Sequence, residues 1–328
     1  MGKKFVICSG QKEYADRLAE HIAERPELAF QICVCTTLEK ALDIQQQKMI
    51  DILLIDCRFK SEQRNKIESK KKFILAKRKK NKIQSNEKEI FQYQPAGAII
   101  SRILEECAGE DAQGIFRSVY REGKELIAVY SPVHRIGKTE FAMTLARHLA
   151  KQKEVLYLNL EEYAAIGGDF EERQKNLADL IYYAKQESGS LGIRVSASVR
   201  KAQEIDVIAP IPVSKDLKEV QPEEWRTLLS GIMEESIYQT VIMDLSESVQ
   251  GLFGLLDMCD TIYMPVIDEP AARAKIDRYT WSIRKTGMDR LQNKTIEVPM
   301  ERNKERCVRQ ALEQSKQGGH DAGSGTVI

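Results

Sequence analysis

Short apolar runs alternate with segments of helical periodicity over the first hundred residues. The apolar runs at 3–10, 28–37 and 49–56 predict three strands, and shorter runs at 73–76 and 89–94 supply two more. Residues 11–25 place Tyr14, Leu18 and Ile22 four apart, which predicts a helix with one buried stripe. Residues 38–47 and 95–107 are predicted helices as well. Strands that alternate with helices predict a parallel sheet covered on both faces.

A second series of the same kind begins after residue 123. A buried strand at 124–131 leads through a turn into a helix at 139–151, in which Phe141, Leu145 and Leu149 share one face. Further strands are predicted within 153–163 and 238–248, a strand and a helix within 259–276, and a strand, a turn and the last helix within 293–312. This series predicts a second parallel sheet with helices on its faces.

Glycine-rich and polar segments separate and end the two series. Residues 109–123 hold several glycines and mixed charges, and 317–328 are rich in glycine. We therefore expect an α/β protein with two doubly wound domains built on parallel sheets, at 1–108 and 124–316, joined by a linker at 109–123 and followed by a flexible tail at 317–328.

Composition places the chain among globular proteins. Its 328 residues are 42% hydrophobic and 30% charged, and a formal net charge of +1 provides no general attraction to nucleic acid or membrane. No apolar stretch approaches the roughly 20 residues that span a bilayer, and the first apolar run is too short for a signal peptide. The seven cysteines are an odd number without zinc-site spacing. We expect buried, reduced thiols in a cytoplasmic protein without a transmembrane segment.

One segment is strongly basic. Residues 60–88 carry twelve Lys or Arg against three Glu, a net charge of +9. Such a run is usually a solvated surface, and a patch for nucleic acid or anionic lipid is the less favoured alternative. Few aromatic residues lie within the run to stack on bases, which disfavours sequence-specific binding of single strands.

The order of elements in the first domain, with Asp56 ending the third strand, resembles a response-regulator receiver domain of flavodoxin-like fold. That family phosphorylates the aspartate with help from an acidic pair that holds Mg²⁺ and from a lysine after the fifth strand. Here Ser9, Gly10 and Gln11 follow the first strand, and Gln94 stands in place of the lysine. A single carboxylate does not hold a hard cation that takes several oxygen ligands. We therefore expect a pseudo-receiver domain that docks a protein partner.

Gly137, Lys138 and Thr139 stand at the predicted turn between a strand and a helix. This setting makes a match to a phosphate-binding loop credible. The unpaired N–H groups and the dipole of a helix N-terminus favour an anion, Lys138 adds a positive charge, and Thr139 offers a hydroxyl to Mg²⁺. The same three residues also make a good helix start where no ligand binds, so both interpretations stay open at this point.

Residues 124–316 as a whole are similar to the ParA/MinD ATPases, a family of P-loop NTPases, because the Gly-Lys-Thr turn is followed by strands that end near Glu161 and Asp244. The resemblance implies ATP or ADP and Mg²⁺ as ligands, and a homodimer. A receiver-like domain in front of such an ATPase is the arrangement of the bacterial CpaE-like proteins of pilus assembly and localisation. The resemblance to this arrangement covers nearly the whole chain.

The resemblance also implies site residues. Lys138 would hold phosphates, Thr139 and Asp244 would hold Mg²⁺, and Glu161 would position the attacking water, which assigns Lys138, Glu161 and Asp244 to the catalytic set. The nucleotide-binding loop would comprise Arg135, Ile136, Gly137, Lys138, Thr139 and Glu140.

The loop departs from the family's Lys-Gly-Gly-x-Gly-Lys-[Ser/Thr] pattern at several positions. Val133 replaces the lysine that reaches the phosphates across the dimer interface, and His134 and Arg135 replace two glycines. Pro132 cannot donate an N–H group, and Glu140 adds a negative charge near the phosphates. Arg135 is a candidate to replace the missing lysine, because a guanidinium suits phosphate oxygens.

Two functions follow from this sequence. The first is a nucleotide-binding positioning or assembly factor of the ParA/MinD or CpaE-like kind, with an impaired P-loop and weak or no ATP hydrolysis. The second is a non-catalytic scaffold that no longer binds nucleotide and works through protein–protein contacts. Pro132, Val133 and Glu140 are the residues that separate the two.

Overall fold

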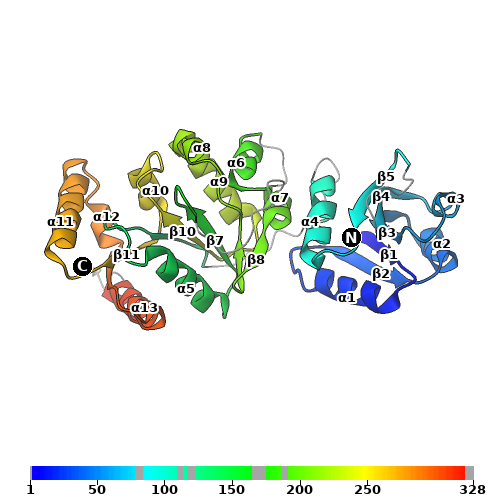
Figure 1. Ribbon diagram of the computed structural model, residues 1–328, viewed down its shortest axis with the longest axis horizontal. Helices are drawn as coiled ribbons and strands as arrows, with labels where there is room; N and C mark the ends of the chain where they lie inside the picture. Colours follow the sequence, from blue (N-terminus) through cyan, green and yellow to red (C-terminus); the bar gives the residue numbers. More distant parts are fainter. Residues whose placement is uncertain are drawn as a thin grey trace, which may run out of the picture. The chain divides into compact units, whose positions relative to one another are not determined.

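The computed structural model describes residues 2–77, 84–108, 114–116, 123–164, 175–186 and 191–321, with side chains as far as residue 317 in the last helix. The chain divides into two compact units, Met1–Val119 with Gly192–Ala197, and Tyr120–Leu191 with Ser198–Ile328 (Figure 1). Most of the expected linker, and residues 322–328 of the expected tail, lie outside the described residues.

The first unit is a five-stranded sheet in the order β2-β1-β3-β4-β5, with every strand pair parallel. Its strands are β1 (Lys3–Cys8), β2 (Phe30–Cys35), β3 (Ile50–Asp56), β4 (Ser69–Ala76) and β5 (Glu87–Phe91). Its helices are α1 (Lys12–Ala23), α2 (Leu38–Gln47), α3 (Ser61–Arg64) and α4 (Ala96–Cys107). This strand order is the flavodoxin-like order that the sequence predicted.

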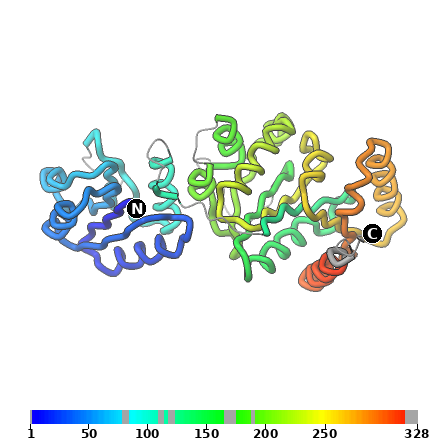
Figure 2. The backbone as a smooth tube through the Cα atoms, turned by 180° about the vertical axis from the view of Figure 1, so that it is seen from behind, coloured from blue at the N-terminus to red at the C-terminus, as the bar shows by residue number. Residues whose placement is uncertain are grey.

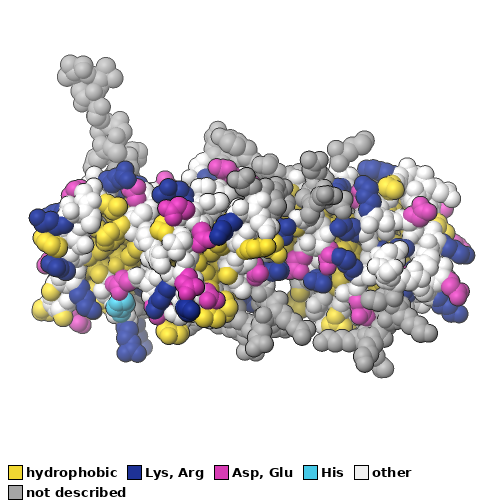
Figure 3. Space-filling model, turned by 90° about the horizontal axis from the view of Figure 1, so that it is seen from above, with side chains coloured by type: hydrophobic (Ala, Val, Ile, Leu, Met, Phe, Trp, Pro, Cys, Tyr) yellow, Lys and Arg dark blue, Asp and Glu magenta, His cyan; other side chains and the backbone are white. Residues whose placement is uncertain are grey.

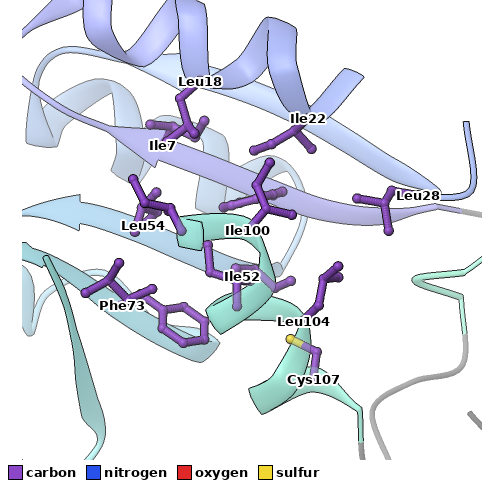
Figure 4. Close-up of a cluster of buried hydrophobic side chains, with 14 of the residues drawn as sticks. Ile7, Leu18, Ile22, Leu28, Ile52, Leu54, Phe73, Ile100, Leu104 and Cys107 are labelled. Atoms are coloured by element: carbon purple, nitrogen blue, oxygen red, sulfur yellow. The ribbon is translucent and has the colours of Figure 1, made fainter. Parts of the chain in front are cut away.

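The central strands β1 and β3 are buried on both faces, which explains why they are nearly continuous apolar runs. In β1, Phe5 and Ile7 join a cluster with side chains of α1 and α4, and Val6 and Cys8 join another with α2. Figure 4 shows the first cluster, in which Ile7 and Ile52 of the sheet meet Leu18 of α1 and Ile100 of α4. Successive residues of a strand point to opposite faces, so the run must be apolar throughout.

The second unit is a seven-stranded sheet in the order β12-β11-β6-β10-β7-β9-β8. Its strands are β6 (Glu125–Val129), β7 (Val155–Leu160), β8 (Arg200–Ala202), β9 (Ile205–Val207), β10 (Thr240–Leu245), β11 (Thr261–Val266) and β12 (Thr295–Pro299). Its helices are α5 (Lys138–Ala150), α6 (Leu177–Lys185), α8 (Ser214–Glu219), α9 (Pro222–Glu235), α10 (Leu252–Met258), α11 (Pro270–Lys285), α12 (Arg290–Asn293) and α13 (Lys304–Asp321), and α7 (Leu191–Ser198) crosses the division between the units.

Helices cover the two faces of the second sheet. α5 and α13 pack on one face, where Phe141 and Leu145 of α5 and Val308 of α13 join a cluster with the strands. Figures 1 and 2 show α13 beside α5, and α6, α8, α9 and α10 lie on the opposite side of the sheet. The expected α/β architecture is confirmed, with one addition: β8 pairs with β9 in an antiparallel manner at the edge.

The described part of the basic segment belongs to the folded first unit. Arg64 and Lys72 are buried, at 3% and 6% exposure. Cationic side chains of the segment contact acidic side chains or carbonyl groups of the same unit: Arg64 with Glu87, Lys70 with Asp51, Lys71 with the carbonyl of Glu106, Lys72 with the carbonyl of Arg64, and Lys88 with the carboxylate of Glu106. The three ion pairs, with Glu87, Asp51 and Glu106, offset part of the positive charge that a polyanion would meet.

Acidic and basic side chains are interspersed on the face that Figure 3 shows, rather than gathered by sign. Arg78, Lys79, Lys80 and Lys82 lie outside the described residues.

Within the part of the chain that the structure describes, no helix has the length and apolar character to cross a membrane. None of the seven cysteines, all of which lie in the described ranges, forms a disulfide; five of them are buried, and Cys33 and Cys57 are half-buried.

Candidate functional site

The turn that ends in Gly-Lys-Thr lies where β6 gives way to α5. Gly137 caps the helix in the left-handed region, with φ +82°, a conformation that suits glycine because it lacks a Cβ. β10 lies between β6 and β7 and is parallel to both, so the carboxyl ends of these three strands lie side by side. The chain segments that follow these strands leave toward opposite faces of the sheet (Figure 1). In open parallel sheets this edge is the usual place for a ligand.

Lys138 connects the three strand ends. Its ammonium group donates to Asp244 Oδ1 at 2.6 Å and to the carbonyl of Leu245 at 2.6 Å, both at the end of β10. It also pairs with the carboxylate of Glu161, which follows β7. The Lys138 side chain is 11% exposed and that of Asp244 is fully buried. Burial alone would lower the pKa of Lys138, but Asp244 and Glu161 outweigh it and hold that pKa above its ordinary value.

Two residues of β7 support this cluster, and the sequence analysis did not single them out as site residues. The hydroxyl of Tyr157 donates to Asp244 Oδ2 at 3.1 Å, and the amide group of Asn159 donates to that hydroxyl at 3.3 Å. Asn159 Oδ1 also accepts from the backbone N–H of Glu161 at 2.9 Å. Burial, followed by the charge of Asp244, raises the pKa of Tyr157 well above its ordinary value. The tyrosine therefore stays neutral and donates.

The remaining loop residues are spread around the turn. Ile136 and Thr139 are half-buried, and Arg135 is exposed with a left-handed φ of +61°. Glu140 is in the first turn of α5, 67% exposed, with its carboxylate 4.0 Å from the ammonium group of Lys304. Of the predicted site residues, the structure thus brings Lys138, Glu161 and Asp244 into direct contact.

The departures from the family pattern have structural roles of their own. Val133 is buried, and its N–H group donates to the hydroxyl of Ser131 at 3.1 Å. His134 Nε2 lies 3.1 Å from a carboxylate oxygen of Glu247, and both side chains are exposed. Val133 is therefore part of the packing under the loop, and His134 is a surface residue.

The donor set fits Mg²⁺ only together with an anionic ligand. Within the described ranges, no group of three or more His, Cys, Asp and Glu side chains is arranged to hold a metal ion. Asp244 and the Thr139 hydroxyl supply two candidate oxygens. Mg²⁺ is commonly held by one or two protein oxygens together with phosphate oxygens and water. A bound polyphosphate would therefore have to complete the site.

Asp56 of the first unit is held by its own arginine. The buried carboxylate accepts from the backbone N–H and the Nε of Arg58 at 3.0 and 2.9 Å, and from the hydroxyl of Ser9 at 3.3 Å. Burial alone would raise the pKa of Asp56, but the contacts with Arg58 and Ser9 outweigh it and lower that pKa. The guanidinium supplies the positive charge beside this carboxylate.

Comparison with known proteins gives likenesses of fold. No protein-family model and no curated protein sequence matches the chain. Among solved structures, a plasmid partition protein from Borrelia burgdorferi is 16% identical, covering 58% of this chain and 86% of that one, with a TM-score of 0.41. A ParA family ATPase from Chlorobium tepidum is 13% identical, covering 60% and 94%, with a TM-score of 0.42.

A MinC:MinD cell division protein complex from Aquifex aeolicus is also similar. It is 16% identical, covering 62% of this chain and 98% of that one, with a TM-score of 0.36. At these identities and scores we assign neither a family nor an activity from the likenesses. The site must be interpreted from its own residues.

Proposed function

We propose that the second unit binds a nucleoside triphosphate, in the first instance ATP, at the loop 135–140. The protein is then a nucleotide-responsive positioning or assembly factor of the ParA/MinD kind. The observation that carries this proposal is the place of Lys138. Its ammonium group lies at the N-terminus of α5, at the carboxyl ends of the strands, beside two carboxylates. A phosphate group fits there because helix N–H groups, the helix dipole and a lysine all favour an anion.

Each site residue has one proposed role. Lys138 holds phosphate oxygens, and Thr139 and Asp244 would hold Mg²⁺, which would neutralise part of the phosphate charge. Glu161 positions the attacking water. Tyr157 and Asn159 keep Asp244 and the Glu161 backbone in place through the hydrogen bonds described above.

The same contacts favour weak binding and slow or no hydrolysis. Lys138 must exchange two carboxylates and a carbonyl for phosphate oxygens, so part of the interaction with nucleotide is offset by the pairs that are lost. Glu161 is engaged by Lys138, and phosphoryl transfer depends mainly on positioning.

Calorimetry on the full chain tests the proposal. Mg-ATP should bind to the wild-type protein, and Lys138→Ala should abolish the heat of binding. Lys151→Ala is a matched control, because Lys151 is an exposed lysine at the other end of α5 and should leave binding unchanged. Binding that survives Lys138→Ala would show that the assignment of the site is wrong.

The second candidate function is a scaffold without nucleotide. The observation that favours it is that Lys138, Asp244 and Glu161 satisfy one another without any ligand. In this case wild-type calorimetry with Mg-ATP shows no binding. The first unit would then dock a protein partner as a pseudo-receiver domain, because Arg58 already neutralises Asp56. Light scattering with and without Mg-ATP tests the homodimer that the resemblance to the ParA/MinD ATPases implies.

A further inference from the structure

We propose that Lys304 is a second phosphate-binding residue of the loop, supplied by α13 of the same chain. This inference rests on the proposed nucleotide binding and adds a residue to it. In the ParA/MinD pattern a second lysine stands where this chain has Val133, and Val133 is buried. The structure places another lysine at the same turn, from a distant part of the sequence.

The side chain of Lys304 lies directly over the turn. A Cβ atom built on Gly137 would be 2.8 Å from Lys304 Cε and 3.2 Å from Lys304 Nζ. The side chain is only 13% exposed, because α13 packs beside α5 on the same face of the sheet. Figures 1 and 2 show the two helices side by side. The packing of α13 beside α5 therefore brings this side chain to the turn.

This is an unfavourable place for a cation when no anion is present. Lys304 is the first residue of α13, and its side chain also lies at the N-terminus of α5. Both helix N-termini carry partial positive charge, which repels an ammonium group. The Lys304 ammonium donates to the carbonyl of Glu301 at 2.6 Å and lies 4.0 Å from the exposed carboxylate of Glu140. An exposed pair at that distance contributes little.

Lys138 and Lys304 differ in the acidic partners of their ammonium groups. Lys138 is already paired with two carboxylates, whereas the only acidic partner found for Lys304 among the described residues is the distant and exposed Glu140. A polyphosphate at the turn would give the Lys304 ammonium an anionic partner, whereas Lys138 would exchange its present partners for phosphate oxygens. Lys304 is also better placed for this than Arg135, which is exposed on a left-handed backbone position.

One consequence distinguishes this arrangement from a lysine supplied across a dimer interface. Both phosphate-binding lysines belong to one chain, so the monomer should bind Mg-ATP without a second chain. The proposal therefore predicts binding at protein concentrations at which light scattering shows only monomer.

Calorimetry of the full chain with Mg-ATP, and with tripolyphosphate as a second probe, tests the proposal. Lys304→Gln should weaken the binding of both ligands on the order of 10- to 100-fold, which is the range for the loss of a hydrogen bond to a charged group. Lys304→Arg, which keeps the charge, should retain most of the affinity. Lys316→Gln, the same substitution at an exposed lysine of α13, is the control and should bind as the wild type does. Melting temperatures without ligand check that each variant is folded.

The outcomes separate the two proposals. If the wild type binds Mg-ATP, Lys138→Ala does not and Lys304→Gln binds as tightly as the wild type, the role of Lys304 is overturned and the nucleotide site stands. If the wild type binds neither probe, both proposals fail. If Lys304→Gln and Lys316→Gln weaken binding equally, the effect is general electrostatics and Lys304 has no specific role.

Discussion

Arg64 and Glu87 form a two-pronged ion pair inside the first unit, with the Arg64 Nε and a terminal nitrogen each 2.9 Å from a different oxygen of Glu87. The side chains are 4% and 0% exposed. Removing one partner would leave a buried charge, so Arg64→Met or Glu87→Leu should reduce the free energy of unfolding by about 3–5 kcal/mol. Urea unfolding measures this loss.

The pair also allows a second comparison. Because a buried ion pair gains little over apolar packing, Arg64→Met combined with Glu87→Leu should recover most of the loss. Arg102→Met, which removes an ion pair on the exposed surface of α4, should change the free energy of unfolding by about 1 kcal/mol or less. A double variant as unstable as the sum of the two single ones would contradict this account.

Acid should destabilise the first unit. Burial raises the pKa of Asp56 and Glu87, but hydrogen bonds from Arg58 and Arg64 outweigh it, so both values lie below the ordinary range. A carboxyl group with a lowered pKa in the folded state stabilises the fold above its unfolded pKa, and this stability is lost as the pH falls. Urea midpoints should be level between about pH 7 and 5 and fall below about pH 4. In Glu87→Gln the urea midpoint should fall less between about pH 5 and pH 3 than in the wild type. A wild-type midpoint at about pH 3 equal to that at about pH 7 would contradict the role of these two carboxyl groups.

Lys138→Met should destabilise the protein even without ligand. Asp244 is fully buried and would lose its cation, at a cost of about 3 kcal/mol. Asp244→Asn alone leaves Lys138 with Glu161 and should cost less. A double-mutant cycle of the two substitutions, measured by urea unfolding, should give a coupling energy well above zero. Lys151→Met is the surface control, and additive effects of Lys138→Met and Asp244→Asn would show that the two residues do not interact.

Gly137→Ala should cost roughly 1–2 kcal/mol, because an alanine is strained at φ +82°. The new methyl group would also displace the end of the Lys304 side chain, which is flexible, so the backbone supplies most of the cost. Gly254→Ala in α10 is the matched control. It meets no atom within 4 Å and lies in a helix, where alanine should stabilise by up to about 1 kcal/mol. Equal effects of the two substitutions would contradict the strain.

The main elements could be predicted because the central strands, such as β1, β3, β6, β7 and β10, are buried and are therefore nearly continuous apolar runs. The Gly-Lys-Thr turn and Asp244 could be placed for the same reason, since the turn follows such a run and Asp244 lies near the end of another. The hairpin of β8 and β9 could not, because its strands have three residues each and β8 is only half-buried. Lys304 follows the last strand in a polar stretch of ordinary composition, and only the packing of α13 beside α5 brings it to the turn.

The contribution of Gly192–Ala197 to the first unit has a consequence for synthesis on the ribosome. Ile193 and Ala197 are buried in the same cluster as Leu28 and Ile115. A nascent chain that ends before residue 197 therefore lacks side chains that complete this apolar cluster. The first unit should become resistant to protease only when the chain has been translated past residue 197, and a fragment cut at residue 119 should expose Leu28 and Ile115 to solvent.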